Sequence, residues 1–316
     1  MAFTEQEAIA SFRMLVCIAH ADGKIHEEER NSLEWALRGI ELPKGVTLEN
    51  LLNEETNVDA QLKLIKNPEA QEACYTSAYA MAHADGECSA EEKKIIEYIK
   101  ATYKLSDEKT TVVGRLFSEA KDTVLPSNIK PISDPKKRAD EVKEDTFKYA
   151  ILSGVMGSFP VPGLSIVLDL AVIGIQVKLV RDIGQYYGHQ IDKAAAKSLL
   201  LGAGVGAGAR IAVTNIAKFV PVFGSAVGAA ASFASTYAVG KMAVAYFENG
   251  CKADMVTLKK AFKDAQKEGG ELFKKNKDTV VAKQQEQKVV LEKLSNDRKA
   301  GKITEEEFER KLTELK

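Results

Sequence analysis

Apolar residues recur at intervals of three and four along most of the chain, the spacing that lines one side of an α-helix. The pattern is clearest in residues 7–20, 30–40, 58–66, 72–84 and 91–105. Proline is scarce, with 8 among 316 residues, so long helices are permitted across most of the sequence. The pattern therefore predicts an all-α protein.

The first third of the chain contains an internal repeat. Residues 19–29 read AHADGKIHEEE and residues 82–92 read AHADGECSAEE, so an offset of 63 residues superimposes identical residues. Each copy has the pattern of a helix that ends at about the ADG triplet, followed by a helix with acids in its first turn. In the second copy, Ser89 and Glu92 have the spacing of a capping box. The repeat predicts a duplicated helical hairpin that forms one compact bundle.

The acidic residues of the two copies raise the question of a metal site. With Gly23 or Gly86 at the sixth position of an EF-hand loop, the first and third positions carry no carboxylate, which excludes an EF-hand. A weaker hypothesis remains, in which both copies contribute ligands to one divalent cation of unknown identity. Its candidate ligands are Asp22, Glu28, Glu29, Asp85, Glu91, Glu92, His20 and His83. The alternative is that these acids only cap helices and form a solvated acidic face.

The paired A-x-A-D-G hairpins, each followed by a Glu-Glu pair, resemble the tellurite-resistance TerB family over about residues 8–120. This resemblance implies an acidic all-helical domain linked to bacterial envelope and stress-response systems. It also implies divalent metal binding through the acids at the motif positions, and it implies no catalysis.

Residues 149–250 are rich in Gly, Ala, Val, Ile and Leu and carry few charges, so a membrane role has to be considered. The uncharged runs 149–168 and 219–240 have about the length that spans a bilayer. Proline and glycine interrupt the first run, and the second consists mostly of small residues, so simple transmembrane helices are disfavoured. Partial burial in the membrane and a tightly packed helical bundle outside it both remain open.

This part of the chain also carries a second duplication. FPVPG at residues 159–163 matches VPVFG at residues 220–224, and each precedes an apolar helix that ends near aromatic residues and glycine. Small residues four apart, among them Gly224, Gly228 and Ser232, would let helices approach closely. The segment resembles the YcjF-like domain that occurs beside bacterial GTPases. The resemblance implies an inner-membrane-associated module with a GTPase as a protein partner.

The tail after residue 250 is rich in lysine. Residues 251–300 hold 13 basic and 8 acidic residues and are expected to be helical, with an interruption at Gly269-Gly270. An excess of positive charge favours an anionic membrane surface, although it is also ordinary for a solvated helix. No aromatic residues alternate with the lysines, so we expect no nucleic-acid binding.

The last 26 residues predict a helical hairpin. Gly301 ends one helix, and Thr304 with Glu307 has the spacing of a capping box for the next. The pattern resembles the SHOCT module, which implies docking on a partner or on another copy of the chain. The expected apolar face consists of Leu291, Leu294, Ile303, Phe308, Leu312 and Leu315. The alternative is a weakly folded terminal helix.

Charge and motif content limit the classes of function. The net charge of −1 conceals a division, because residues 1–105 carry −8 and residues 151–316 carry +7. No P-loop, Rossmann, zinc-protease or serine-hydrolase motif is present, so we expect no enzymatic activity. The first residues lack the basic and apolar regions of a secretory signal, which predicts a cytoplasmic location, peripheral to or partly embedded in the inner membrane.

The sequence thus predicts five segments, which are an acidic bundle (1–120), a proline-containing linker (121–145), an apolar helical domain (146–250), a basic helical segment (251–288) and a terminal hairpin (289–316). The expected function is a membrane-associated, non-catalytic adaptor of an envelope or stress-response system. Alternatives from other classes are a self-assembling structural protein that forms homo-oligomers and a metal-dependent hydrolase that acts through Asp22 and Asp85.

Overall fold

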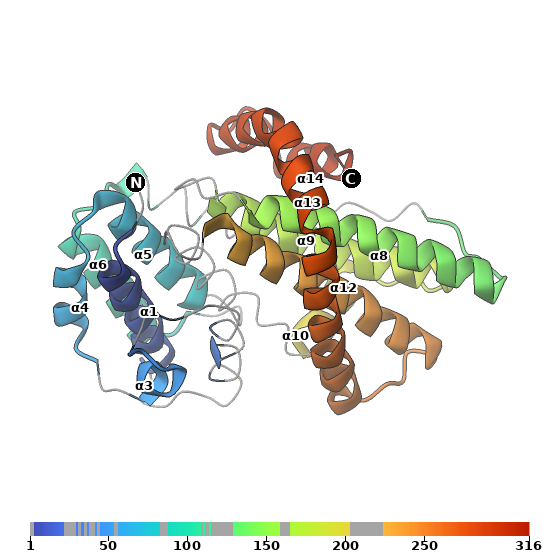
Figure 1. The fold of residues 1–316 in the computed structure, drawn as a ribbon, viewed down its shortest axis with the longest axis horizontal. Helices are drawn as coiled ribbons and strands as arrows, with labels where there is room; N and C mark the ends of the chain where they lie inside the picture. Colours follow the sequence, from blue (N-terminus) through green and yellow to red (C-terminus); the bar gives the residue numbers. More distant parts are fainter. Residues whose placement is uncertain are drawn as a thin grey trace. The chain divides into compact units, whose positions relative to one another are not determined.

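The computed structural model confirms the all-α prediction: within the residues that it describes there are eleven helices and no strand (Figure 1). The described residues are 3–21, 30, 33–34, 37, 42, 45–53, 56–82, 88–108, 110, 114, 129–158, 165–202 and 224–315. The chain divides into two compact units. The first contains α1 to α6, and the second contains α8, α10, α13, α14 and most of α9 and α12.

The first unit is built around a pair of helices that the repeat places in equivalent positions. Helix α1 (Glu5–Ala19) packs against α5 (Pro68–Ala82), and both bounds of α5 lie 63 residues after those of α1. Helices α3 (Leu48–Asn53), α4 (Val58–Leu64) and α6 (Ala90–Thr102) also pack on α1. The fully buried side chains of Phe12, Leu15 and Ile18 place the centre of this core on α1. Helix α1 ends at Ala19, two residues before the ADG triplet at which the repeat pattern predicts its end.

The two equivalent helices begin with equivalent caps. The Thr4 hydroxyl accepts a hydrogen bond from the Glu7 N–H at 3.2 Å, and the Asn67 side chain accepts one from the Glu69 N–H at 2.9 Å. The Glu7 carboxylate then connects the two starts, because it also accepts from the N–H groups of Lys66 at 3.1 Å and Asn67 at 2.7 Å. The duplication therefore extends to the residues that start each helix.

The second unit begins inside the segment that the sequence predicts to be a linker. Helix α8 (Pro135–Gly157) starts at Pro135, since proline fits the first turn of a helix, where its missing N–H needs no partner. The Asp134 carboxylate accepts from the Lys137 N–H at 2.7 Å and stabilises this start. Residues 135–145 are therefore helical, which corrects the predicted extent of the linker.

Helices α8, α9 (Ser165–Tyr186) and α12 (Gly224–Glu248) pack together through apolar residues and a few buried hydrogen bonds. The Gln176 amide on α9 donates to the hydroxyls of Ser235 and Thr236 on α12 at 3.2 and 3.1 Å. A Cβ at Gly240 of α12 would lie 2.4 Å from the Thr146 side chain on α8, so this glycine permits a close crossing. Helix α10 (Lys193–Gly202) follows α9 along the chain.

Helix α13 (Met255–Lys299) runs without interruption for 45 residues, which corrects the predicted break at Gly269-Gly270. It crosses α12, where Phe273 packs on Phe233 with ring centroids 5.6 Å apart, and it also packs against α8 (Figure 1). A Cβ at Gly269 would lie 3.0 Å from the Ala234 Cα, whereas one at Gly270 would meet nothing within 4 Å. Gly269 is thus required at the crossing, and the helix continues because its packing outweighs the low helix propensity of glycine.

The C-terminal hairpin forms largely as the sequence predicts. Gly301 has a φ of 70° after the last turn of α13, and the capping box of Thr304 and Glu307 starts α14 (Glu305–Thr313). Leu291, Leu294, Phe308 and Leu312 are buried between the two helices, while Ile303 and Leu315 are half-buried. Arg298 and Glu305 form a buried ion pair across the turn.

Among the helices that the structure describes, none combines the length and the apolar character needed to cross a membrane.

Candidate functional site

The predicted metal ligands fall only in part within the described residues. Asp22, Glu28, Glu29, His83 and Asp85 lie outside them. His20 is exposed at the end of α1, and Glu91 is exposed in the first turn of α6. No group of three or more His, Cys, Asp or Glu side chains suited to a metal occurs in the part of the chain that the structure describes. The divalent-cation site of the repeats remains a prediction.

Glu92 takes part in the helix cap that the sequence offers as the alternative to a metal site. Its carboxylate accepts a hydrogen bond from the Ser89 N–H at 2.8 Å, and the Ser89 hydroxyl accepts one from the Glu92 N–H at 3.1 Å. One carboxylate oxygen of Glu92 therefore stabilises the start of α6. The capping-box prediction for Ser89 and Glu92 is confirmed.

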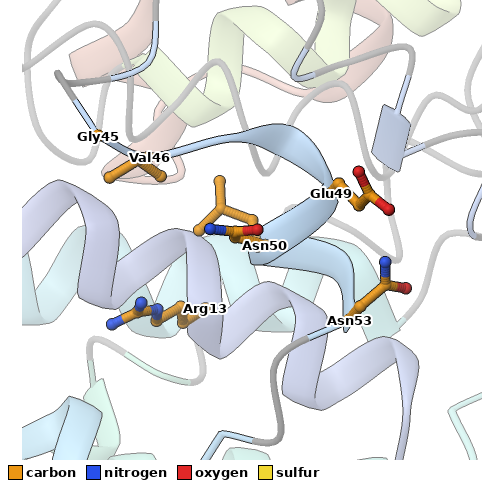
Figure 2. A pocket seen from close by; sticks show the side chains of 7 residues that line it. Arg13, Gly45, Val46, Glu49, Asn50 and Asn53 are labelled. Atoms are coloured by element: carbon orange, nitrogen blue, oxygen red, sulfur yellow. The ribbon is translucent and has the colours of Figure 1, made fainter.

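A hollow of about 510 Å³ lies between α1 and α3 in the first unit. Figure 2 shows Arg13 of α1 on one side and Asn50 and Asn53 of α3 on the other, with Gly45 and Val46 at the approach to α3. The Asn53 side chain accepts a hydrogen bond from the Arg30 guanidinium at 3.2 Å. The lining is mixed in charge and includes Glu49, so it indicates no particular ligand.

The clearest separation of charge lies on α13, whose side chains form three rows along the helix. The first row is buried against the rest of the second unit and against α14. The second row, here called the lysine row, consists of exposed lysines three, four, seven or eleven residues apart, spacings that return to nearly the same side of a helix. Its members are Lys260, Lys263, Lys267, Lys274, Lys277 and Lys288.

The third row, here called the acidic row, lies about a quarter-turn or slightly more around the helix from the lysine row. It carries Asp264, Glu268, Glu271, Glu286 and Asp297. Four residues depart from this separation: Asp278, five helical turns after Lys260, and Glu292 fall on the lysine row, and Lys275 and Lys293 fall on the acidic row. The net charge of the segment is thus distributed unevenly around the helix, with the positive charge on one exposed side.

Ion pairs reduce the lysine row's charge at two points only, as far as the described contacts go. Lys274 lies 2.8 Å from the Glu271 carboxylate, and Lys288 lies 3.9 Å from the Glu292 carboxylate. The hydrogen bond from Lys274 lowers the pKa of the Glu271 carboxyl below its ordinary value of 4.5. Both pairs are exposed to solvent, where such contacts contribute little free energy, so the lysines remain accessible to an anionic surface.

The lysine row also carries exposed apolar side chains but no exposed aromatic ring. Val256 is 78% exposed and Val281 is 39% exposed, and helical spacing places both on this side. Phe262 and Phe273, the aromatic residues of α13, are buried. This side of the helix can therefore contact a surface through charge and aliphatic groups, without stacking on bases.

A buried ionic group in the second unit has a structural role. The Lys178 ammonium donates to both carboxylate oxygens of Asp182, at 2.9 and 2.8 Å, and the Tyr149 hydroxyl donates to Asp182 at 3.0 Å. Asp182 is 1% exposed and Lys178 is 15% exposed. Burial and the neighbouring carboxylate raise the pKa of Tyr149 far above its ordinary value. The group joins α8 to α9.

The positive charge of the tail was evident in the sequence, but its position on one row was not recognised there. The spacing of the lysines is the signal that finds it, once α13 is known to be a single continuous helix. A break at Gly269-Gly270 would have placed the lysines before and after it on unrelated sides.

One known protein resembles the chain over part of its length. Magnetosome membrane protein 22 of Magnetospirillum gryphiswaldense is 31% identical to it over 134 residues, which cover 40% of this chain and 67% of that protein. No family model matches the chain. No solved structure matches it either. The resemblances to TerB, YcjF-like and SHOCT modules accordingly remain predictions.

Proposed function

Because the chain belongs to the same family as magnetosome membrane protein 22, we propose that it is a peripheral, non-catalytic adaptor that associates with a membrane surface. The observation that carries the proposal is the lysine row of α13, which gathers exposed positive charge on one side of a long helix. The partner is the anionic surface of a lipid bilayer.

The dimensions of the lysine row suit an extended, flat anionic surface. From Lys260 to Lys288 the row extends about 42 Å, at a rise of about 1.5 Å per residue. Each lysine near an anionic bilayer contributes about 1 kcal/mol of attraction at physiological ionic strength. Several lysines on one rigid helix can therefore contact lipid headgroups at the same time.

The aliphatic residues on the same side favour a bilayer over other polyanions. Val256 and Val281 can enter the boundary between headgroups and acyl chains while the neighbouring lysines contact phosphates. Proteins that bind single-stranded nucleic acid generally present aromatic rings to the bases, and α13 exposes none.

The adaptor role follows from the charge division between the two parts of the chain. Residues 1–105 carry a net charge of −8, so an anionic membrane repels them while it attracts the lysine row. The acidic part is then available for a basic protein or a divalent cation. A GTPase is the protein partner that the YcjF-like resemblance implies.

Vesicle co-sedimentation tests the proposal with two lysines of α13 that are eight residues apart in the sequence. Lys267→Glu lies on the lysine row and Lys275→Glu lies on the acidic row, and both variants change the net charge by the same amount. With phosphatidylcholine vesicles that contain phosphatidylglycerol, we expect Lys267→Glu to weaken binding about tenfold or more and Lys275→Glu to weaken it less than about threefold. The triple variant Lys263→Glu, Lys267→Glu, Lys274→Glu should abolish binding.

Salt and lipid composition complete this test. Binding should be lost with phosphatidylcholine alone and should weaken as salt rises, since screening shortens the range of the attraction to about 10 Å at 0.1 M. Equal losses in the two single variants would contradict the lysine row as the contact. Tighter binding to a single-stranded oligonucleotide than to anionic vesicles would contradict the choice of partner.

A further inference from the structure

The C-terminal half of the acidic row carries the most exposed apolar group of α13 outside the lysine row. Val289 is 75% exposed and Val290 is 44% exposed, and both lie within a continuous helix. The surface around them, here called the Val289 face, consists of Ala282, Glu286, Val289, Val290 and Lys293, all of them exposed. Two adjacent valines on the outside of a helix expose apolar area to water at a free-energy cost, which contact with another surface would remove.

A negative and a positive side chain lie at equal distances before and after the two valines. Glu286 precedes Val289 by three residues, and Lys293 follows Val290 by three residues. Both charged residues lie on the same row as Val289. The Val289 face is therefore self-complementary with respect to a twofold axis that passes between the two valines.

We propose that the Val289 face binds a second copy of this chain, with the two α13 helices antiparallel. In that arrangement Val289 lies beside Val289 of the other copy and Val290 beside Val290, and Glu286 of each copy faces Lys293 of the other. A parallel arrangement would place Glu286 against Glu286 and Lys293 against Lys293, which is repulsive at both positions. The symmetry of a twofold dimer requires a surface that is complementary to itself, as this one is.

The area available indicates a weak association. Residues 282–297 extend about 22 Å, and the contact of two single helices over this length is smaller than the roughly 800 Å² per partner of stable complexes. The dimer should therefore depend on concentration. This inference does not rest on the proposed membrane function, because its test uses the protein in solution without lipid.

Sedimentation velocity of the full chain over a range of concentrations provides the test. We expect the weight-average sedimentation coefficient to rise with concentration toward that of a dimer. Glu286→Lys should raise the dissociation constant about tenfold, since it places two lysines opposite each other at both ends of the contact. Lys293→Glu should have an equal effect for the same reason. Val289→Asp should abolish the association.

The double variant Glu286→Lys, Lys293→Glu decides the register. It restores opposite charges in the antiparallel pair and should return the dissociation constant to within about threefold of the original value. Asp264→Lys is the matched control, because it makes the same kind of change on the acidic row outside the Val289 face, and it should leave the association unchanged. All the altered side chains are exposed, and circular dichroism checks that each variant is folded.

Three outcomes would overturn the proposal. The first is a monomer at every soluble concentration. The second is a dimer that neither Glu286→Lys nor Val289→Asp weakens, which would place the contact elsewhere. The third is a double variant as weak as the two single variants, which would exclude the antiparallel pairing of Glu286 with Lys293.

Discussion

Glu7 shows how one buried carboxylate can join two repeats at the residue scale. It is 5% exposed, and its oxygens accept hydrogen bonds from backbone N–H groups at the start of both α1 and α5. Burial raises the pKa of this carboxyl, and the hydrogen bonds from Thr4, Asn67 and Lys66 outweigh burial, so the pKa lies below its ordinary value of 4.5. The charged form is therefore the one that the fold stabilises.

Glu7→Ala should lower the free energy of unfolding of the first unit by about 2–4 kcal/mol, because it leaves buried N–H groups without an acceptor. Since the pKa of Glu7 is depressed in the folded protein, its contribution is present above pH 4.5 and is lost as the pH falls through the folded value. Urea unfolding followed by fluorescence of Trp35, the chain's single tryptophan, measures this at pH 6 and in acid. An equal loss of stability in acid for Glu7→Ala and the unaltered protein would contradict this assignment.

The pair of Lys178 and Asp182 is a second feature that depends on single residues. Lys178→Met should cost about 3–5 kcal/mol of unfolding free energy, because it leaves the Asp182 charge buried without its cation. The double variant Lys178→Met, Asp182→Asn should recover much of this loss, since an asparagine is neutral and still accepts from the Tyr149 hydroxyl. Thermal unfolding by circular dichroism compares the variants. If the double variant is less stable than Lys178→Met, the buried charge is not the cause.

At the scale of elements, the crossing of α13 over α12 depends on one of two adjacent glycines. Both lie inside α13, so alanine at either position gains the same helix propensity of about 0.5–1 kcal/mol. Their surroundings differ, because a Cβ at Gly269 meets the backbone of Ala234 and a Cβ at Gly270 meets nothing within 4 Å. Backbone atoms at a crossing cannot move aside as a flexible side chain can.

Gly270→Ala should therefore raise the free energy of unfolding by about 0.5–1 kcal/mol, and Gly269→Ala should lower it by about 1–3 kcal/mol. Chemical unfolding followed by circular dichroism at 222 nm measures both variants under the same conditions. A stabilising Gly269→Ala would show that the two helices do not cross closely at this point.

At the scale of the whole molecule, three different sides of α13 serve three different contacts, of which one is observed and two are proposed. The buried row holds the helix on its own unit, the lysine row faces the proposed membrane, and the Val289 face meets the proposed second copy. In an antiparallel pair placed side by side, the twofold axis is perpendicular to the plane of the two helices. Both lysine rows then point to the same side of that plane, so the proposed dimer and the proposed membrane contact are compatible.

Local sequence patterns were sufficient for the features that depend on neighbouring residues. They predicted the all-α class, the capping boxes of Ser89 with Glu92 and Thr304 with Glu307, and the glycine turn before α14. Each of these depends on residues within a few positions of one another, since helix periodicity and capping are local properties. The predicted cation site in the acidic repeats is different in kind, because its ligands would come from two repeats.

Only the tertiary structure decided the features that depend on distant residues. The sequence predicts a break at Gly269-Gly270, but α13 is continuous because Gly269 packs on Ala234, 35 positions earlier in the chain. It predicts a linker up to residue 145, but α8 begins at Pro135 because its apolar residues are buried in the second unit. The sequence by itself thus determined the helices and their caps through local hydrogen bonding. Tertiary packing decided the length of α13, and with it which lysines and valines share an exposed row.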